Sequence, residues 1–491
     1  MPESAVSITV DGAAADGGSH RYAKVPHLWA LGVGCVIGGD FYGWQSTLVA
    51  GFSGLLIILA FVTVLYVLLS FSIAEMSSMI PAGGGPYVFS LHAIGPRAAF
   101  FAGLAETLKV VVTVATTFYT IYLYLDALFG IGSAYSPLWW FGFGTIFVGL
   151  NVLGVEASFR VQVAATLLST IMLLIFYVGA ATQLDYNKWV VQQNWEFTTW
   201  SDAVQGISFG LWFYFGIEEL PLAVEETIEP EKNMPRGLMV SIATLVVLSF
   251  ATSVFSSLIE PGAVEVMQST APLVLGYKSV FGDTTTLSYF TWLTVVGIIS
   301  STHSFVFCMG RLLFAIARDG FFPQFLTKVH PTRGSAYAAL IAGGLASQVI
   351  ALILHFAIGD ARLGGVLINL ALIGALVSYA FQLISFITLR IKQPNRRRPY
   401  RSPFGVWGAV LGLFMVLLCL VAIVYSGASS TDFLASIVAA VALFALGTVY
   451  FVKCVRPRLD QSPKTPEARA KDLREGLMSV RSNVSRVSSR Y

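Results

Sequence analysis

The sequence predicts an all-α polytopic membrane protein with twelve transmembrane helices. Of its 491 residues, 56% are hydrophobic and 12% are charged, whereas soluble domains are about 45 to 50% apolar and about 25% charged. Apolar stretches of roughly 17 to 25 residues, the length that a bilayer requires, recur between residues 26 and 452. These stretches are apolar on all sides and do not alternate as membrane strands do, which favours helices.

Three segments follow from this pattern: a disordered N-terminal tail (1–25), a membrane transport domain (26–452) and a basic, disordered C-terminal tail (453–491). Eleven spans follow the first one, so we do not interpret it as a removable signal peptide. The C-terminal tail carries ten basic and four acidic residues and is expected to rest on anionic lipid, not on nucleic acid. The predicted spans are 28–53, 55–79, 98–129, 137–153, 161–183, 201–224, 237–259, 287–317, 336–357, 363–389, 404–426 and 432–452.

The basic residues between the spans predict the orientation in the membrane. If both termini are cytoplasmic, sixteen Lys and Arg residues before the tail lie in cytoplasmic segments and three, Lys188, Lys278 and Arg362, lie outside. Cytoplasmic loops of membrane proteins carry such an excess, so this orientation is predicted, with the plasma membrane as the expected location. The cluster Arg396-Arg397-Arg398 is then a topology anchor or a lipid or regulatory contact.

Two predicted spans contain residues that an uninterrupted membrane helix avoids. The first reads Gly38-Gly39-Asp40-Phe41-Tyr42-Gly43-Trp44 at its centre, and the sixth reads Gly216-Ile217-Glu218-Glu219-Leu220-Pro221. Glycine costs about 1 kcal/mol in a helix relative to alanine, and a carboxylate at membrane depth costs a few kcal/mol more. Unwound backbone at this depth is tolerated where it lines a protein-enclosed cavity. The two spans are therefore predicted to be broken helices at a transport site.

The positions of the two breaks divide the chain into spans one to five and spans six to ten. Five is an odd number, so the second set runs inverted relative to the first. This is the inverted-repeat arrangement that many secondary transporters use for alternating access. A transporter whose site lies between the two breaks is the function that the pattern favours.

Between residues 25 and 403 the chain resembles amino acid-polyamine-organocation (APC) superfamily permeases, and among these it is most similar to ethanolamine permeases. The resemblance implies a LeuT-like 5+5 inverted repeat with broken helices 1 and 6 and two peripheral helices. The segments that carry it are 31–44, with its glycine-acid-aromatic-Gly-Trp run, Glu75-Met76 with Pro81–Tyr87, Gly216–Glu226 with Pro230 and Asn233–Gly237, and Gly310–Gly320.

Amino acid permeases of this superfamily usually carry a glycine-serine-glycine run in the first break, where the substrate carboxylate docks. Here Asp40 occupies the third position, and a fixed carboxylate there repels a substrate carboxylate. A small amine, with ethanolamine as the best fit, is the expected substrate. The alternatives are an amino acid or polyamine permease and a transporter-like nutrient sensor, whereas no catalytic constellation indicates an enzyme.

The predicted substrate site combines carboxylates with aromatic faces that attract an ammonium group. Asp40 is either an ammonium partner or a structural cap of the unwound segment. Adjacent glutamates on a helix point about 100° apart, so Glu218 and Glu219 are not expected to face the same group. Tyr42 and Trp212 are further candidate aromatics. The substrate-binding candidates are Ile37, Gly38, Gly39, Asp40, Phe41, Trp44, Tyr214, Gly216, Ile217, Glu218 and Glu219.

The sequence has no phosphate-binding loop for ATP, so transport is expected to be coupled to an ion, Na⁺ or H⁺, with uncoupled exchange as the alternative. Glu106 and Lys109 lie three residues apart on one helical face and form either a self-neutralising pair or a proton relay. The resemblance assigns the hydroxyls of a Na⁺ site to Ser300 and Ser301, and His303 is either a core histidine or a proton carrier.

Glu225 and Glu226 are expected at a solvated helix end, with a gate as the alternative. Neither a cofactor nor a resident metal is expected, and the oligomeric state is not predicted.

Overall fold

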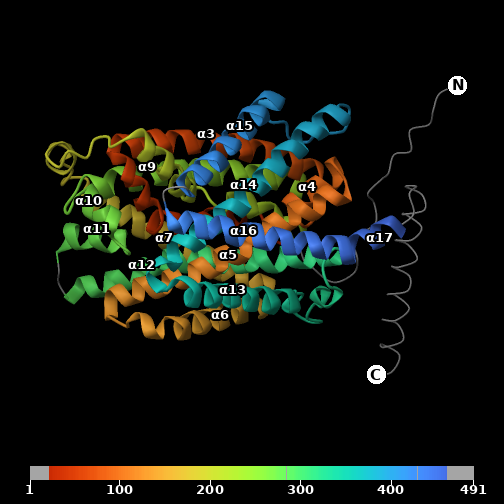
Figure 1. Ribbon diagram of the computed structural model, residues 1–491, viewed down its shortest axis with the longest axis horizontal. Helices are drawn as coiled ribbons and strands as arrows, with labels where there is room; N and C mark the ends of the chain where they lie inside the picture. Colours follow the sequence, from red (N-terminus) through yellow and green to blue (C-terminus); the bar gives the residue numbers. More distant parts are fainter. Residues whose placement is uncertain (1–20, 283–284, 428–429, 462–491) are drawn as a thin grey trace. The chain divides into compact units, whose positions relative to one another are not determined.

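The structure of the chain is a computed structural model that describes residues 21–282, 285–427 and 430–461. Most of the two predicted tails, residues 1–20 and 462–491, lies outside the described residues. Within them every regular element is a helix, and one isolated β-bridge joins Ala23 to Thr227. The α-helices (Figure 1) are α1 Val25–Val36, α2 Gly38–Phe41, α3 Gly51–Met79, α4 Pro86–Ala93, α5 Pro96–Phe129, α6 Ser136–Val152, α7 Val155–Ala180, α8 Trp200–Gly210, α9 Pro230–Ser257, α10 Ala263–Gln268, α11 Pro272–Phe281, α12 Thr285–Arg318, α13 Tyr337–Ile358, α14 Asp360–Lys392, α15 Gly405–Gly427, α16 Thr431–Tyr450 and α17 Arg456–Gln461.

Shorter helical turns connect these helices or interrupt them. Five are of the 3₁₀ type: η1 Trp44–Ala50, η2 Ser133–Tyr135, η4 Leu211–Phe213, η5 Ile217–Glu226 and η6 Gln324–Thr327. Two are π-helical: η3 Asn187–Val191 and η7 Phe451–Val455. By its contacts the chain divides into Met1–Val441 and Ala442–Tyr491, and the described part of the second unit is the end of α16, η7 and α17.

Ten helical segments in the described residues are long and apolar enough to cross a membrane. The other two predicted spans, 28–53 and 137–153, correspond to shorter elements. The first overlaps α1 and α2, which lie within Val25–Phe41, while its remainder from Trp44 belongs to the crossing segment Trp44–Met79. The second is α6, with 17 residues. The chain is therefore an integral membrane protein built from many apolar helices, and the count of twelve spans and the 5+5 repeat stay predictions.

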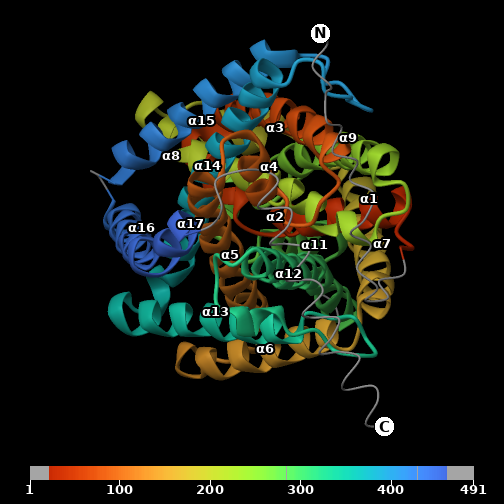
Figure 2. The same ribbon diagram turned by 90° about the vertical axis from the view of Figure 1, so that its right-hand side faces the viewer.

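The spanning helices differ in how deeply they are buried in the bundle. Of the most apolar part of Trp200–Glu226, 89% is buried, against 39% for Tyr337–Ile358. Large apolar side chains such as Val178, Phe356 and Trp407 are exposed on the outer helices, which lipid tails would cover. α5 packs against α12 and α14, and in Figure 2 α5 and α12 run through the middle of the bundle with α13, α6 and α7 outside them. The interior helices therefore position the site.

Candidate functional site

The first break separates α1 from η1. α1 ends at Val36, and the single turn α2 follows it after Ile37. The backbone then becomes extended at Tyr42 (φ −154°, ψ 145°) and left-handed at Gly43 (φ 101°). Gly43 has a conformation that only glycine adopts without strain. The chain is thus interrupted within the glycine-rich run that the sequence singled out.

The second break lies between α8 and η5. The chain passes through η4, turns at Tyr214 to Gly216, and continues as the 3₁₀ segment η5, which contains Pro221. Gly216 has φ 112°, and a Cβ atom added there would lie 2.8 Å from Phe305 and 3.2 Å from Cys35. Both the backbone conformation and the close approach of α12 and α1 therefore require glycine at this position.

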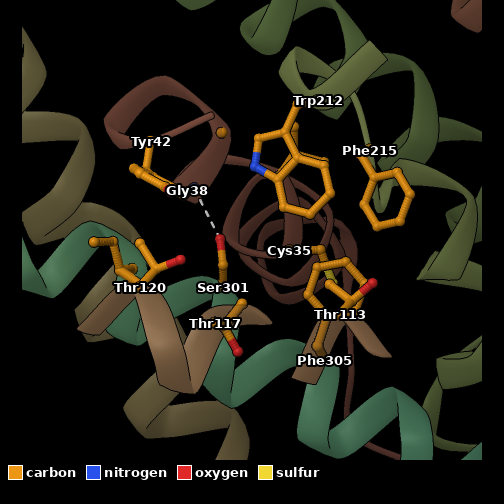
Figure 3. A pocket seen from close by; sticks show the side chains of 13 residues that line it. Cys35, Gly38, Tyr42, Thr113, Thr117, Thr120, Trp212, Phe215, Ser301 and Phe305 are labelled. Atoms are coloured by element: carbon orange, nitrogen blue, oxygen red, sulfur yellow. Dashed lines mark hydrogen bonds between the residues drawn. The ribbon is translucent and has the colours of Figure 1, made fainter. Parts of the chain in front are cut away.

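A small cavity of about 20 Å³ lies between the two breaks. This volume holds about one water molecule, so a solute of several heavy atoms enters only if the surrounding elements move apart. Figure 3 shows side chains from both breaks, α5 and α12 around this space. All of them are uncharged. They are Cys35, Val36, Gly38, Gly39, Tyr42, Thr113, Thr117, Thr120, Trp212, Phe215, Ile298, Ser301 and Phe305.

The cavity wall combines aromatic rings with hydroxyl groups. Trp212 stacks on Phe215, with ring centroids 4.7 Å apart at 20° between planes. The opposite wall is a row of threonines, Thr113, Thr117 and Thr120, which share one face of α5 because residues three or four apart are neighbours on a helix. None of these threonines was among the predicted site residues. Their spacing within an otherwise apolar span is the signal that identifies them.

Most backbone amides of the first break already have acceptors. Four of them donate hydrogen bonds of 2.7 to 3.1 Å within the protein, which leaves fewer free donors for a substrate carboxylate than an unwound helix end usually offers. The pairs are Gly38 with Ser301 Oγ, Asp40 with the Ile37 carbonyl, Tyr42 with the Gly38 carbonyl and Gly43 with Gln45 Oε1.

The Asp40 side chain contacts α9 and is not among the residues that line the cavity. Its Oδ1 accepts a hydrogen bond of 2.9 Å from Thr252 Oγ1, which also contacts the Tyr177 hydroxyl at 2.6 Å. Asp40 is buried, and its Oδ2 has no hydrogen-bond partner among the described residues. A buried carboxyl group with one unpaired oxygen either binds a further partner or is protonated, because burial of an unpaired charge is unfavourable.

The other predicted aromatic residues pack inside the bundle. The Phe41 ring packs against Gly297 of α12. The ring centroids of Trp44 and Phe213 lie 5.6 Å apart. The Tyr214 hydroxyl contacts Thr63 and Ser249 at 2.7 Å each. Among the predicted substrate-binding residues, Gly38 and Gly39 line the cavity, as do the candidate aromatics Tyr42 and Trp212, while Ile37, Gly216 and Ile217 are buried around it.

Four charged side chains meet in the interior beside the second break. Lys109 Nζ lies 2.5 Å from Glu106 Oε1, 2.9 Å from Glu218 Oε1 and 2.6 Å from Glu219 Oε1. All four side chains are fully buried. Glu106 and Lys109 therefore form the pair expected from their spacing, and both glutamates of the second break join it. We call these four residues the Lys109 cluster.

The expectation that Glu218 and Glu219 could not face the same group is wrong, because both contact Lys109. That expectation assumed a regular helix, whereas the two residues begin η5 directly after the left-handed Gly216. Glu218 Oε2 also accepts the Gly216 amide at 3.1 Å, so the carboxylate folds back on the break. Neither glutamate lines the cavity that Gly38 and Gly39 line.

Ser300 and Ser301 lie where α12 contacts α1. Ser301 Oγ donates to the Gly34 carbonyl at 2.9 Å. Ser300 Oγ lies 2.9 Å from Gln162 Nε2 and 3.0 Å from Thr166 Oγ1, and both partners also donate to the Ala30 carbonyl. Both hydroxyls proposed for a Na⁺ site thus have hydrogen-bond partners within the protein, and the Gln162 amide of α7 donates to the Ser300 hydroxyl and to the Ala30 carbonyl.

His303 lies in a separate buried network. Its Nε2 is 2.8 Å from Ser158 Oγ, and its Nδ1 is 3.3 Å from the Asn151 amide nitrogen. Ser158 in turn donates to Asn151 Oδ1 at 2.9 Å. This network holds α6, α7 and α12 together away from the cavity lining.

Salt bridges connect the helix ends on the side predicted to be cytoplasmic. Glu226 is buried and pairs with Arg311, and Glu225 pairs with Arg318 at 2.8 Å. The expectation of a solvated helix end is wrong for Glu226, because the end of η5 packs against α12. These pairs hold η5 to α12.

Arg398, one of the three basic residues interpreted as a topology anchor, is also buried. Its Nε lies 2.9 Å from Glu75 Oε1, and its guanidinium donates to the carbonyls of Leu389, Gln393, Pro394 and Arg396. Arg398 therefore has a structural role that a simple topology anchor does not have.

Known proteins resemble the chain along most of its length. The model of the family described as amino acid permease matches residues 27–446. An uncharacterized transporter of Rhizobium meliloti is 26% identical over 80% of this chain and 84% of its own length. The methylthioribose transporter of Bacillus subtilis is 25% identical over 77% of this chain and 83% of its own. The branched-chain amino acid permease BcaP of the same bacterium is 25% identical over 82% of this chain and 87% of its own length. The chain belongs to the amino acid permease family.

Proposed function

We propose that the protein imports a small amine, with ethanolamine as the substrate, by alternating access across the plasma membrane with both termini in the cytoplasm. Membership of the permease family supports transport. The observation that carries the choice of an amine is Asp40, a buried carboxylate in the first break with one oxygen unpaired among the described residues.

The charge of Asp40 attracts a cation in the cavity electrostatically, without direct contact. Gly39, the preceding residue, lines the cavity, so an ammonium there lies on the order of 8 Å from the carboxylate. At that distance, an effective dielectric constant of about 20 gives an attraction of about 2 kcal/mol. A substrate carboxylate at the same place is repelled by a similar amount.

The cavity lining supports a small substrate with an ammonium group. Trp212 and Phe215 offer ring faces, each of which attracts a cation by about 0.5 to 2 kcal/mol. Thr117 lies across the cavity (Figure 3) and is one of several hydroxyls that can exchange a backbone bond for a bond to the substrate. The amides of the first break are mostly occupied, which disfavours a second, anionic group on the substrate.

An amino acid permease is the second candidate. The uncharged cavity lining favours it, because a zwitterion needs no net charge in its site. The relatives also include an L-asparagine permease of Mycobacterium bovis, 24% identical over 85% of this chain and 88% of its own length. The two candidates differ in whether the substrate carries a carboxylate next to Asp40.

Counterflow in proteoliposomes separates the candidates. The purified chain is reconstituted, loaded with unlabelled ethanolamine and given labelled ethanolamine outside, with choline, putrescine, alanine and arginine as competitors. We expect labelled ethanolamine to accumulate and alanine to compete weakly. In a parallel experiment the proteoliposomes are loaded with unlabelled alanine and given labelled alanine outside. Accumulation of labelled alanine there, with no accumulation of labelled ethanolamine in the first experiment, would exclude the amine proposal.

Asp40→Asn tests the residue that carries the proposal. Loss of about 2 kcal/mol corresponds to roughly a 30-fold weaker apparent affinity for ethanolamine. Asp185→Asn, at an exposed position outside the site, is the matched control and should transport normally. Unchanged affinity in Asp40→Asn would assign Asp40 the role of a structural cap.

A further inference from the structure

The Lys109 cluster contains more negative than positive charge. Three carboxylates lie within 2.9 Å of a single ammonium, which donates a hydrogen bond to Glu218. If every group is ionised, the buried cluster has two negative charges in excess. An uncompensated buried charge is strongly unfavourable, so a cluster of this kind retains a proton.

The partners of each carboxylate indicate which one carries the proton. Glu218 accepts from Lys109, from the Tyr379 hydroxyl at 2.5 Å and from the Gly216 amide. Glu106 accepts from the Ser378 hydroxyl in addition to its pair with Lys109. Glu219 has its contact with Lys109, and neither of its oxygens has a hydrogen bond among the described residues. Donors favour the ionised form of a carboxylate, so Glu219 is the site for the proton.

Among the described residues, the elements packed around the cluster add hydroxyls and thiols to it. α14 contributes the Tyr379 hydroxyl, and α3 contributes Tyr66, whose hydroxyl lies 3.0 Å from that of Tyr379. The remaining titratable groups that act on the cluster are thiols: Cys308 of α12, with Cys35 of α1 beside it, and Cys419 of α15 next to Tyr66. Lys109 is thus the single cation of the cluster among the described residues.

The cluster is mechanically connected to the cavity. Lys109 lies four residues, about one helical turn, before Thr113, which lines the cavity on α5. Glu218 and Glu219 begin η5 directly after the second break. Movement of α5 relative to η5, which a larger cavity requires, therefore separates Lys109 from Glu219 and exposes the cluster to water.

We propose that Glu219 is the proton-binding site that couples transport to a proton gradient. In the closed state the carboxylate binds one proton as a carboxylic acid, and when the cavity opens toward the cytoplasm this proton dissociates into water as the substrate leaves. One proton thus moves in the same direction as each substrate. The proposal rests on the transport function proposed above, because it names the ion that drives transport through the same cavity.

Proteoliposomes containing a pH-sensitive dye in the lumen test this coupling, with the membrane potential clamped. Labelled ethanolamine is supplied outside, and the lumen is one pH unit more alkaline than the outside. If one proton accompanies each substrate, the ratio of labelled ethanolamine inside to outside can reach about tenfold. We expect the wild type to approach this ratio and to acidify the lumen. Glu219→Gln should lose both effects to a greater extent than it loses counterflow at equal pH, and its thermal unfolding midpoint, compared with that of the wild type, shows whether it is folded. Glu265→Gln, at an exposed position on α10, is the matched control and should behave as the wild type.

A second measurement needs no substrate. The infrared spectrum of the purified protein in bilayers should contain the carbonyl band of a buried carboxylic acid at neutral pH, and Glu219→Gln should lose one such band while Glu265→Gln keeps it. If Glu219→Gln does not fold, Glu219→Asp keeps a carboxyl group and should keep proton coupling.

Three outcomes would overturn the proposal: uptake by the wild type without acidification, gradient-driven accumulation by Glu219→Gln, or an unchanged infrared spectrum in that variant. If no tested solute is transported, the proposed function fails and the infrared spectrum still decides whether Glu219 binds the proton.

Discussion

Gly216 at the second break is the position where a single methyl group should have a large effect. Gly216→Ala places a side chain at φ 112°, a strained backbone that costs about 1 to 3 kcal/mol. The new Cβ also lies 2.8 Å from Phe305 and 3.2 Å from Cys35, and overpacking of this kind costs about 1 to 3 kcal/mol more. The expected loss of stability is therefore about 2 to 6 kcal/mol.

Two other glycines separate the backbone effect from the packing effect. Gly359, between α13 and α14, has φ 82° with no atom within 4 Å of an added Cβ, so Gly359→Ala has the backbone cost of about 1 to 3 kcal/mol alone. Gly149 within α6 has neither strain nor a close neighbour. Gly149→Ala should stabilise the protein by about 0.5 to 1 kcal/mol, because alanine is the better helix former.

Thermal unfolding in detergent, followed by the fluorescence of a thiol-independent dye, ranks the three variants against the wild type. The expected order of midpoints is Gly149→Ala highest, then the wild type, Gly359→Ala and Gly216→Ala. Counterflow at a permissive temperature should also be lost in Gly216→Ala, since the methyl group fills the space beside the break. A midpoint for Gly216→Ala equal to that of Gly359→Ala would refute the packing argument.

Three further substitutions test the buried polar contacts. Arg398→Met removes one of the two arginines that pair with buried Glu75, and Arg390 remains as the other, so it should lower the free energy of unfolding by about 1 to 3 kcal/mol, measured by chemical denaturation. Ser158→Ala removes the hydroxyl that bonds His303, with an expected loss of about 1 to 3 kcal/mol in the same measurement and normal substrate affinity. Arg311→Met unpairs buried Glu226 and should open the end of η5, so that a thiol reagent labels cavity-lining Cys35 several-fold faster, as read by mass spectrometry.

The sequence predicted the class of the protein and the two interruptions because both depend on local composition. Long apolar stretches identify membrane helices, and glycines with a carboxylate at membrane depth identify places where a helix breaks. The structure interrupts the chain at Ile37 to Gly43 and again at Tyr214 to Gly216. The resemblance to permeases of the APC superfamily was confirmed by the amino acid permease model over residues 27–446, whereas the similarity to ethanolamine permeases stays a prediction.

The side-chain contacts of the site could not be predicted in the same way, because they depend on helices far apart in the chain. Asp40 contacts Thr252, 212 residues later, and Lys109 contacts Glu218, 109 residues later. A backbone that leaves the regular helix also removes the periodicity from which side-chain directions are inferred, which is why both Glu218 and Glu219 reach one ammonium. The threonines of α5 were detectable in principle, since their spacing is regular.

The second break and the Lys109 cluster form one structural unit. Glu218 binds the Gly216 amide and Lys109 at once, so the carboxylate satisfies a backbone group that the break leaves unpaired and joins it to α5. Rearrangement of the break must therefore alter the cluster, and a change of charge in the cluster must alter the break, because coupling between two sites is reciprocal. A transporter needs this link: the cavity should open when the ion state changes, and Glu218, which bonds to the break, is adjacent to Glu219, whose charge is proposed to change.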